Sequence, residues 1–431
     1  MPGGIGADEQ AVATAEVGAV GSTSARPFGV YLHIPFCSAR CDYCDFATWT
    51  DRTHLAEAYA DACVVDLRRR YEADGPDGSG ADGSGAPPPA TTVFVGGGTP
   101  SLLPAATLVR ILDAIPRVPG AEVTVECNPE SVDLAKLTAY RAAGVTRLSF
   151  GVQSMVDRVL AALGRLHRRG DVDAAVAAAR AAGFETFNLD LIYGGHGETA
   201  ADWSETLDRA LDLDPPHVSA YALTVEPGTP LAGRINAGEL LAPDDDVLAD
   251  RYDVADERLG GSGRPWYEIS NWARPGHECR HNGIYWDQGD YLGIGCAAHG
   301  HTGGRRWWTV RTPERYVDRV TRGVSPEGGA ERLDPDRRAE ERLALALRTR
   351  GGAVLAPTSA VDAEIAALAA EGLLTSADAP GGTRVVLTRT GRRLGGELTA
   401  RFMALGARPV PLALGMLECQ PPGPGAGTSP W

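Results

Sequence analysis

Short apolar runs alternate with amphipathic helical patterns from residue 28 to residue 223, and this alternation restricts the fold more than any other feature. Six of the runs are rich in β-branched or apolar residues, which predicts strands. The predicted strands cover 29–33, 91–95, 122–126, 146–150, 186–192 and 217–223. Strands that alternate with helices pair in parallel through right-handed crossovers. We therefore expect an α/β fold, a partial (β/α)6 barrel, with a doubly wound open sheet as the alternative.

The rest of the chain divides around this unit. The predicted barrel covers 27–262, and a stretch rich in Gly, Asp, Ser and Pro at 72–90 predicts a disordered insertion within it. An aromatic-rich connecting region follows at 263–330. Helix, helix, strand and helix patterns then predict a small winged-helix-like α+β domain at 331–407. The two ends have the composition of a disordered arm and a disordered tail, at 1–26 and 408–431.

Charge and hydrophobicity exclude several classes of partner. The net charge of −15 argues against binding to nucleic acid, and it favours a lid or docking role for the C-terminal domain. No run approaches the ~18 apolar residues of a membrane span, and the first residues do not resemble a signal or transit peptide. We expect a cytoplasmic protein without a transmembrane segment, and peripheral membrane association through partners stays open. Eight irregularly spaced cysteines favour a metal or cluster site over disulfides.

Three of these cysteines, Cys37, Cys41 and Cys44, lie together directly after the first predicted strand. Short spacings on a loop let thiolates wrap one [4Fe-4S] cube. Three thiolates hold three irons and leave the fourth open to another ligand. Zinc, the alternative, prefers four nitrogen or sulfur donors in a closed site, and no second cysteine pair follows. The motif therefore predicts a cluster with one open iron.

Small and polar residues recur where the predicted strands end. Gly97, Gly98 and Thr99 follow the second strand, where glycines let a ligand approach the backbone closely. Later strands contribute Glu126, Gln153, Arg165 and Asp190. Each of these alone could be a capping or solvated residue. Together, at the carboxyl ends of barrel strands, they predict a binding ring whose carboxylates suit ribose hydroxyls and whose arginine suits a carboxylate.

The cysteine spacing after the first strand of a βα chain resembles the radical S-adenosylmethionine (SAM) superfamily. This resemblance implies that SAM chelates the open iron, and that one electron from the cluster breaks its sulfonium–carbon bond. From about residue 30 to residue 405, the chain is similar to the oxygen-independent coproporphyrinogen III oxidase group in strings such as YLHIPFC, CDYCDF, GGGTPS, ECNPES, LSFGVQS, NLDLIYG and HNGIYW. The resemblance implies that the three cysteines are the cluster ligands. It also implies eight SAM contacts, at Tyr31, Gly97, Gly98, Thr99, Glu126, Gln153, Arg165 and Asp190.

Two features resemble the HemW branch of this group, whose members bind haem and pass it to acceptor proteins. The authentic oxidases have a further cysteine two residues after the third ligand, where this chain has Phe46. They also lack the HNxxYW string, which is present here at 281–286. One departure lies after the fifth strand, where the group has YGxPGxT and this chain has His196 in place of the proline.

Candidate haem contacts cluster in and after the HNxxYW string. Haem iron usually binds His, Cys, Met or Tyr. The possible iron ligands are His281, Cys296, His299 and His301. The aromatic residues that could stack on the porphyrin are Tyr285, Trp286, Tyr291, Trp307 and Trp308. The arginines that could pair with the propionates are Arg305 and Arg306. We select His281 as the haem contact. The alternative is that these aromatic residues form a seam between domains.

Two functions are consistent with these patterns. The first is a haem chaperone with a SAM-binding [4Fe-4S] cluster, whose partners are haem and haem-accepting proteins. The second is the oxidase itself, which would convert two propionates to vinyl groups. An electron donor is required if SAM is cleaved. Phe46 and the HNxxYW string favour the chaperone, whereas the SAM site alone also suits the oxidase.

Overall fold

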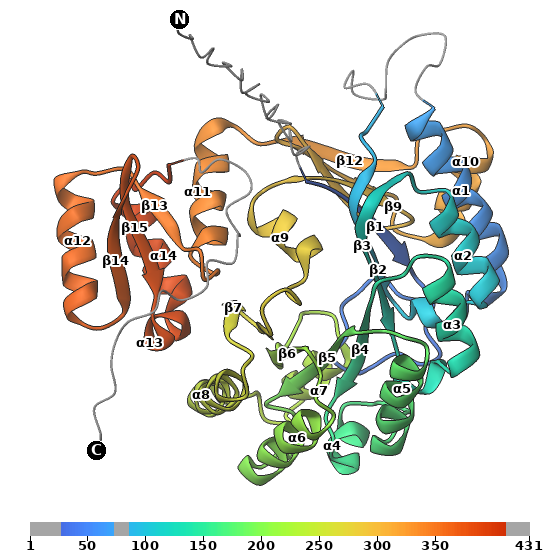
Figure 1. The fold of residues 1–431 in the computed structure, drawn as a ribbon, viewed down its shortest axis with the longest axis horizontal. Helices are drawn as coiled ribbons and strands as arrows, with labels where there is room; N and C mark the ends of the chain where they lie inside the picture. Colours follow the sequence, from blue (N-terminus) through green and yellow to red (C-terminus); the bar gives the residue numbers. More distant parts are fainter. Residues whose placement is uncertain (1–26, 73–85, 411–431) are drawn as a thin grey trace, which may run out of the picture.

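The computed structural model describes residues 27–72 and 86–410. Its centre is a curved sheet in which the first six strands are parallel and lie in sequence order (Figure 1). These strands are β1 (Phe28–Ile34), β2 (Ala90–Gly97), β3 (Arg117–Cys127), β4 (Arg147–Gln153), β5 (Thr186–Tyr193) and β6 (His217–Ala222). The predicted partial barrel is confirmed, because a doubly wound sheet would change direction partway along its strand order.

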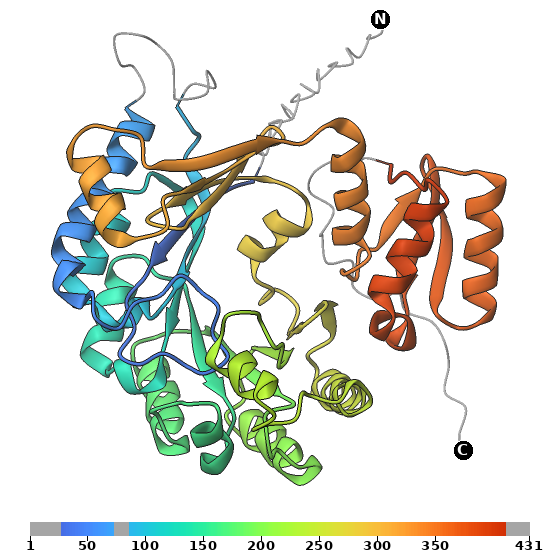
Figure 2. The same ribbon diagram turned by 180° about the vertical axis from the view of Figure 1, so that it is seen from behind.

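Helices cover the convex outer face of this sheet (Figure 2). They are α1 (Ala56–Tyr71), α2 (Ala105–Asp113), α3 (Leu134–Ala142), α4 (Asp157–Ala162), α5 (Arg169–Ala181) and α6 (Ala200–Asp212). Local sequence explains their positions. For example, α6 begins at a capping box in which Thr199 and Asp202 accept hydrogen bonds from each other's backbone N–H groups. Its apolar side then buries Trp203 and Leu207 against the strands.

Two further helices, α7 (Pro230–Asn236) and α8 (Asp245–Gly261), lead into the aromatic-rich region. The structure shows that this region supplies strands at both edges of the sheet. They are β7 (Trp266–Glu268), β8 (Asn271–Ala273), β9 (Asp290–Ile294), β10 (His299–Thr302), β11 (Arg305–Thr309) and β12 (Glu327–Arg332). The full order is β12-β11-β10-β9-β1-β2-β3-β4-β5-β6-β8-β7. The sequence pattern predicts no strands here, because the segments are short and their pairing with β1 and β6 is not local.

The helix α9 (Arg280–Trp286) carries the HNxxYW string and lies on the concave side of the sheet, between the barrel and the C-terminal part (Figure 1). A last helix of the barrel region, α10 (Pro313–Thr321), packs beside α1 on the outside. The concave side is therefore occupied by residues that follow the six predicted strands in sequence. This arrangement brings the HNxxYW string beside β1 and β2.

The C-terminal module has its own hydrophobic core and a three-stranded antiparallel sheet of order β13-β15-β14. Its elements are α11 (Pro335–Ala346), β13 (Ala353–Leu355), α12 (Ser359–Ala370), β14 (Leu374–Ala379), β15 (Gly382–Leu387), α13 (Arg389–Arg393) and α14 (Gly395–Ala404). The sequence pattern predicts one strand and one closing helix after α12, where the structure has three strands in the module and two closing helices. Residues 408–410 also pair beside β13, so ordered chain extends past the boundary expected at 407.

A buried ion-pair cluster attaches this module to the barrel. The Asp256 carboxylate on α8 accepts hydrogen bonds from Trp272 Nε1 at 2.9 Å, from Arg389 Nε at 2.7 Å and from both terminal nitrogens of Arg392 at 3.1 and 2.8 Å. The Arg392 guanidinium also lies 4.2 Å from the ring centroid of Trp266. Charge-assisted bonds and cation–π contact thus fix α13 against α8.

The described residues do not include every predicted segment. The arm at 1–26, residues 73–85 of the predicted insertion and residues 411–431 of the predicted tail lie outside them. Within the described part of the chain, no helix combines the length and the apolar character needed to cross a membrane.

Candidate functional site

The loop after β1 carries the three predicted cluster cysteines. Two backbone hydrogen bonds close the base of this loop, from Cys37 N to Trp49 O at 3.1 Å and from Trp49 N to Pro35 O at 2.8 Å. Within it, Cys44 N donates to Cys41 O at 3.2 Å, which brings the second and third cysteines close together. All three thiols are free and half-buried. The spacing read from the sequence therefore corresponds to one compact loop with three half-buried thiols.

Polar side chains from two other loops reach these thiols. Thr99 Oγ1 lies 3.7 Å from Cys37 Sγ, and Arg165 Nη1 donates to Cys41 Sγ at 3.4 Å. Burial raises the pKa of the Cys37 thiol and of the Cys44 thiol. A metal that replaces the protons would remove this penalty, and a nearby guanidinium favours the thiolate form that iron requires.

The donor set fits a cube better than a single ion. Among residues 27–72 and 86–410, no three His, Cys, Asp or Glu side chains converge in a way that could hold one metal ion. Structural zinc needs four converging donors, whereas the thiolates of a [4Fe-4S] cube each bind a different iron. The three loop cysteines would hold such a cluster and leave one iron for another ligand.

The glycine-rich loop after β2 lies against this cysteine loop, and its close packing requires glycine. Gly97 has φ +112°, and a Cβ atom there would stand 2.5 Å from the ring of His33. A Cβ on Gly98 would stand 2.7 Å from Phe36 O and 3.0 Å from Cys37 Sγ. Any larger residue would push the two loops apart. Glycine therefore lets the two loops pack in contact, and both glycines are half-buried there.

Two carboxyl groups lie beneath this loop inside the barrel. Glu126 Oε2 accepts a hydrogen bond from Gly97 N at 3.1 Å, and burial together with nearby Asp190 raises the pKa of Glu126 to about 8. Asp190 accepts from Ser149 Oγ at 2.7 Å and from Asn188 Nδ2 at 2.8 Å, and burial raises its pKa. At neutral pH, Glu126 is therefore mostly protonated and ready to ionise when a cation or a hydrogen-bond donor arrives.

Arg165 connects the cysteine loop to the ends of β3 and β4. Besides its contact with Cys41, its Nη2 donates to Asn128 Oδ1 at 2.8 Å and to Gly151 O at 3.0 Å. Gln153 at the end of β4 has φ +61°, and its buried Oε1 has no hydrogen-bond partner in the described chain. A strained residue with an unsatisfied oxygen is typical of a ligand site. Asn128 was missed by the sequence analysis, although it lies in the quoted string ECNPES.

A cavity of about 390 Å³ extends from these loops to the aromatic-rich region. Its lining residues come from β1, the cysteine loop, the glycine loop, α9, β9 and β10, and are Tyr31, His33, Phe46, Ala47, Gly97, Tyr285, Tyr291, Ala297 and His299. Phe46 is 58% exposed, which is unusual for a phenylalanine. The cavity therefore joins the predicted SAM residues Tyr31 and Gly97 to three of the predicted haem-contacting residues.

His281, our selected haem contact, does not line this cavity. It is fully buried, with its Nδ1 2.8 Å from Thr92 Oγ1 and its Nε2 2.8 Å from Tyr285 OH. Burial lowers the pKa of its imidazole to about 3. Since both ring nitrogens already have hydrogen-bond partners, the structure leaves neither of them free for iron. His281 instead orients Tyr285, which is part of the cavity wall.

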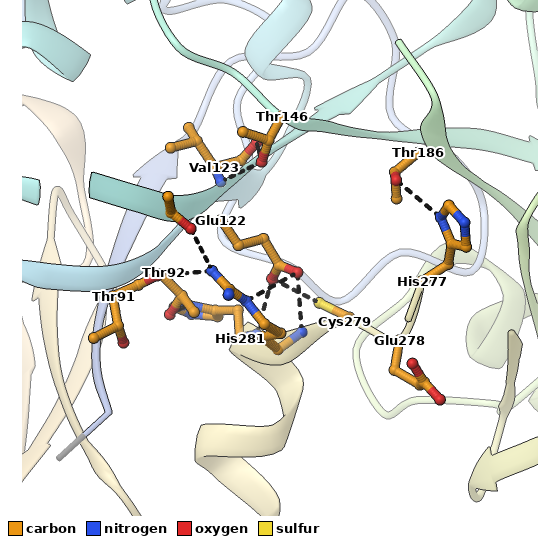
Figure 3. A network of polar contacts seen from close by, with 12 residues as sticks. Thr91, Thr92, Glu122, Val123, Thr146, Thr186, His277, Glu278, Cys279 and His281 are labelled. Carbon is orange, nitrogen blue, oxygen red and sulfur yellow. Dashed lines mark hydrogen bonds and ion pairs between the residues drawn. The ribbon is translucent and has the colours of Figure 1, made fainter. Parts of the chain in front are cut away.

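Figure 3 shows how the start of α9 is held in place. The Glu122 carboxylate of β3 accepts from His281 N at 3.0 Å and from Arg280 N at 3.1 Å, and Cys279 Sγ lies 3.8 Å from it. These contacts satisfy backbone groups that a helix start leaves unpaired. The barrel wall thereby fixes the helix that positions Tyr285.

Of the other candidate haem contacts, the structure places some at the cavity and others inside the fold or away from the cavity. His301 Nδ1 bonds Gly289 O at 2.9 Å, and Cys296 Sγ lies 3.6 Å from Tyr59 OH, so both are engaged inside the fold. His299 lines the cavity. Trp286, Trp307 and Trp308 do not line it.

The two arginines that we expected to pair with propionates already have partners. Arg305 pairs with Glu327 at 2.6 Å, and Arg306 pairs with Glu331 at 2.7 Å and Glu341 at 3.0 Å. These ion pairs join β11 to β12 and α11. The structure therefore gives Arg305 and Arg306 a structural role in place of the expected one.

The turn after β5, where His196 stands in place of the group's proline, is closed by hydrogen bonds. Glu198 closes the turn with its side chain, which accepts from Gly194 N at 2.7 Å, and with its own N–H, which donates to Gly195 O at 2.9 Å. His196 is exposed and lines a smaller hollow of about 240 Å³ beside Tyr43 of the cysteine loop. These two hydrogen bonds hold a turn that has His196 where the group has proline.

Comparison with known proteins agrees with this geometry. A model of the radical SAM superfamily matches residues 82–210. A protein of Mycobacterium tuberculosis (strain H37Rv) named Heme chaperone HemW is 46% identical over 374 residues, which is 86% of this chain and 93% of that protein. The Heme chaperone HemW of Escherichia coli (strain K12) is 36% identical over 306 residues, or 70% of this chain and 75% of that protein.

Among solved structures, coproporphyrinogen III oxidase (HemN) from Escherichia coli matches with a TM-score of 0.72 and 24% identity, over 88% of this chain and 90% of that chain. The fold and the cysteine loop define a radical SAM protein, a class that uses a [4Fe-4S] cluster and SAM. The identity and coverage of the curated relatives narrow this further. The chain belongs to the HemW family.

Proposed function

We propose that this protein is a haem chaperone, which binds haem and delivers it to haem-accepting proteins. The observation that carries the proposal is the 46% identity to a Heme chaperone HemW over 93% of that protein's length. The cavity supports it, because Tyr285, Tyr291 and Phe46 give aromatic faces and His299 gives an imidazole in one space. The cytoplasmic location and the identity of the acceptors stay predictions.

We further propose that Cys37, Cys41 and Cys44 hold a [4Fe-4S] cluster and that SAM binds beside it. Three of the eight predicted SAM residues lie at one side of the cavity. Tyr31 and Gly97 line it, and the Glu126 carboxyl group accepts a hydrogen bond from Gly97 N. When bound, the cluster and SAM would supply one-electron chemistry. The protein residues would orient SAM and keep water from it.

The alternative function is oxygen-independent coproporphyrinogen III oxidase activity. The predicted SAM contacts at the carboxyl ends of the barrel strands favour the oxidase activity, since a chaperone that only carries haem would not require them. Phe46 opposes it, because the authentic oxidases of this group have a cysteine at that position. If SAM is cleaved, an electron donor would be a further partner.

Parallel assays on the anaerobically reconstituted full chain separate the two functions. We expect haem to remain bound through gel filtration, and we expect no conversion of coproporphyrinogen III to protoporphyrinogen IX. Conversion coupled to 5′-deoxyadenosine formation would overturn the chaperone proposal. Tyr285→Ala should weaken haem binding because it removes one side of the cavity, whereas Tyr71→Ala, at the end of the outer helix α1 and away from the cavity, serves as the matched control.

A further inference from the structure

One buried arginine inside the barrel has no protein partner. Arg147 begins β4 and is only 3% exposed, yet its guanidinium has no hydrogen bond or ion pair in the described part of the chain, and its Nε is fully enclosed. Buried arginines are normally paired, because an isolated buried charge is costly. Arg264 shows the usual case here, since it is 2% exposed and bonds Pro215 O and Asp214.

A second unsatisfied polar group lies directly beside it. Thr124 of β3 is the register partner of Arg147, is fully buried, and its hydroxyl has no hydrogen-bond partner among the described residues. Arg147 lies two residues before Ser149, which points to Asp190, so its side chain is on the same inner face of the sheet. Two adjacent donors without acceptors on one inner face indicate a place for an acceptor that is not part of the chain.

The nearby carboxylates are already engaged elsewhere. Glu122 uses its oxygens for the backbone at the start of α9 (Figure 3), and Asp190 accepts from Ser149 and Asn188. The remaining titratable groups in electrostatic reach of Arg147 are buried thiol, phenol, carboxyl and imidazole groups, namely those of Cys279, Tyr267, Glu126, His217 and His277. None of them makes a hydrogen bond or an ion pair with Arg147, so its charge is held near acidic groups but left unpaired.

A row of inner-face residues connects this pair to the cavity. Tyr31, Phe94, Thr124 and Arg147 are successive register partners across β1 to β4. Strands lie about 4.8 Å apart, so the row spans roughly 14 Å from the cavity wall to the arginine. Phe94 is half-buried and stacks on Tyr31, with ring centroids 6.4 Å apart. An apolar ligand bound beside Tyr31 in the cavity could therefore direct a polar arm along this inner face toward Arg147.

We propose that Arg147 and Thr124 form a carboxylate-binding site inside the barrel. Arginine matches a carboxylate with two parallel hydrogen bonds, and the threonine hydroxyl can donate a third. The carboxylate has two possible sources, a propionate of haem or a propionate of coproporphyrinogen III. The haem source rests on the proposed function, whereas the coproporphyrinogen source rests on the alternative function.

The test compares ligands that differ only in this carboxylate. The reconstituted full chain and its Arg147→Met variant are titrated with haem and haem dimethyl ester, and separately with coproporphyrin III and its tetramethyl ester. Arg311→Met, an exposed arginine elsewhere, is the control for the change in net charge. Loss of a buried charge-assisted bond predicts roughly 10- to 100-fold weaker binding of the source ligand by Arg147→Met and little change for its carboxylate-free partner. Thr124→Val should give a smaller loss with the same preference.

The outcomes are distinct. Selective weakening of haem binding identifies a haem propionate, and selective weakening of coproporphyrin III binding identifies a propionate of the oxidase substrate. Equal affinities of wild type and Arg147→Met for both haem and coproporphyrin III overturn the site. An equal loss for acid and ester, together with a lower melting temperature of the ligand-free variant, also overturns it, because that result indicates a structural role. If the wild type does not bind haem, the proposed function fails, and the coproporphyrin III titrations still decide the site.

Discussion

Replacing Glu126 by Gln should remove a specific pH dependence of folding stability. The pKa of Glu126 is raised from 4.5 to about 8, chiefly by burial and next by Asp190. Between these two pH values the folded protein retains a proton that the unfolded chain has lost. This contribution to stability is complete below pH 4.5 and is lost as the pH rises through about 8.

The structure sets the size of this effect. Each tenfold difference in proton affinity corresponds to about 1.4 kcal/mol, so the full change would be ~5 kcal/mol. Glu126 is not completely sealed from solvent, so we expect about 2–4 kcal/mol between pH 4.5 and 8. Gln keeps the shape and can still accept from Gly97 N, but it does not ionise.

Urea unfolding of the full chain without SAM, followed at several pH values by tryptophan fluorescence, measures this difference. Glu198 and Glu268 also have pKa values raised by burial to about 7, so the wild type alone would show a mixture of effects. Subtraction of the Glu126→Gln curve isolates Glu126, and Glu371→Gln, an exposed change on the C-terminal module, is the control. A difference curve that stays flat from pH 4.5 to 8 would refute the reasoning.

Three further predictions concern the cluster, the glycine loop and the module. Cys41→Ala should abolish the visible absorption of the reconstituted cluster, whereas Cys63→Ala, a buried core thiol, should retain it; retained absorption in the first variant would contradict the ligand assignment. Gly97→Ala places a Cβ atom against His33 on a residue with positive φ, so it should cost about 1–3 kcal/mol in stability. This cost should be seen as a lower melting temperature, and SAM binding should be weaker in equilibrium dialysis. Asp256→Ala should cost about 3–5 kcal/mol and speed limited proteolysis between barrel and module, since it leaves buried Arg392 unpaired.

Each of the last two variants has a matched control. Gly120→Ala has the same kind of positive φ but open space around its Cβ, so it should show backbone strain without loss of SAM binding. Asp246→Ala removes an exposed carboxylate from the same helix, α8, and should leave the module attached. If a variant and its control lose SAM binding equally, or release the module equally, the local contacts described above are not the cause.

Local sequence determined the parts of this protein that depend on neighbouring residues. The alternation of apolar runs and amphipathic helices predicted β1 to β6 in the right order, because each strand and helix is specified by its own periodicity. The cysteine spacing and the Gly97–Gly98 pair likewise marked one loop cluster before its geometry was known. These features are written within a few residues of each other.

Tertiary structure alone decided what each side chain could do. His281 resembled a free ligand in the sequence, but it is bonded to Thr92, which is 189 residues away along the chain. Arg305 resembled a partner for propionates, but β12 supplies its partner Glu327. Arg147 resembled an ordinary strand residue, yet the barrel buries it beside Thr124 without an acceptor. Hydrogen-bond partners and burial depend on contacts between distant segments, which a pattern of neighbouring residues does not contain.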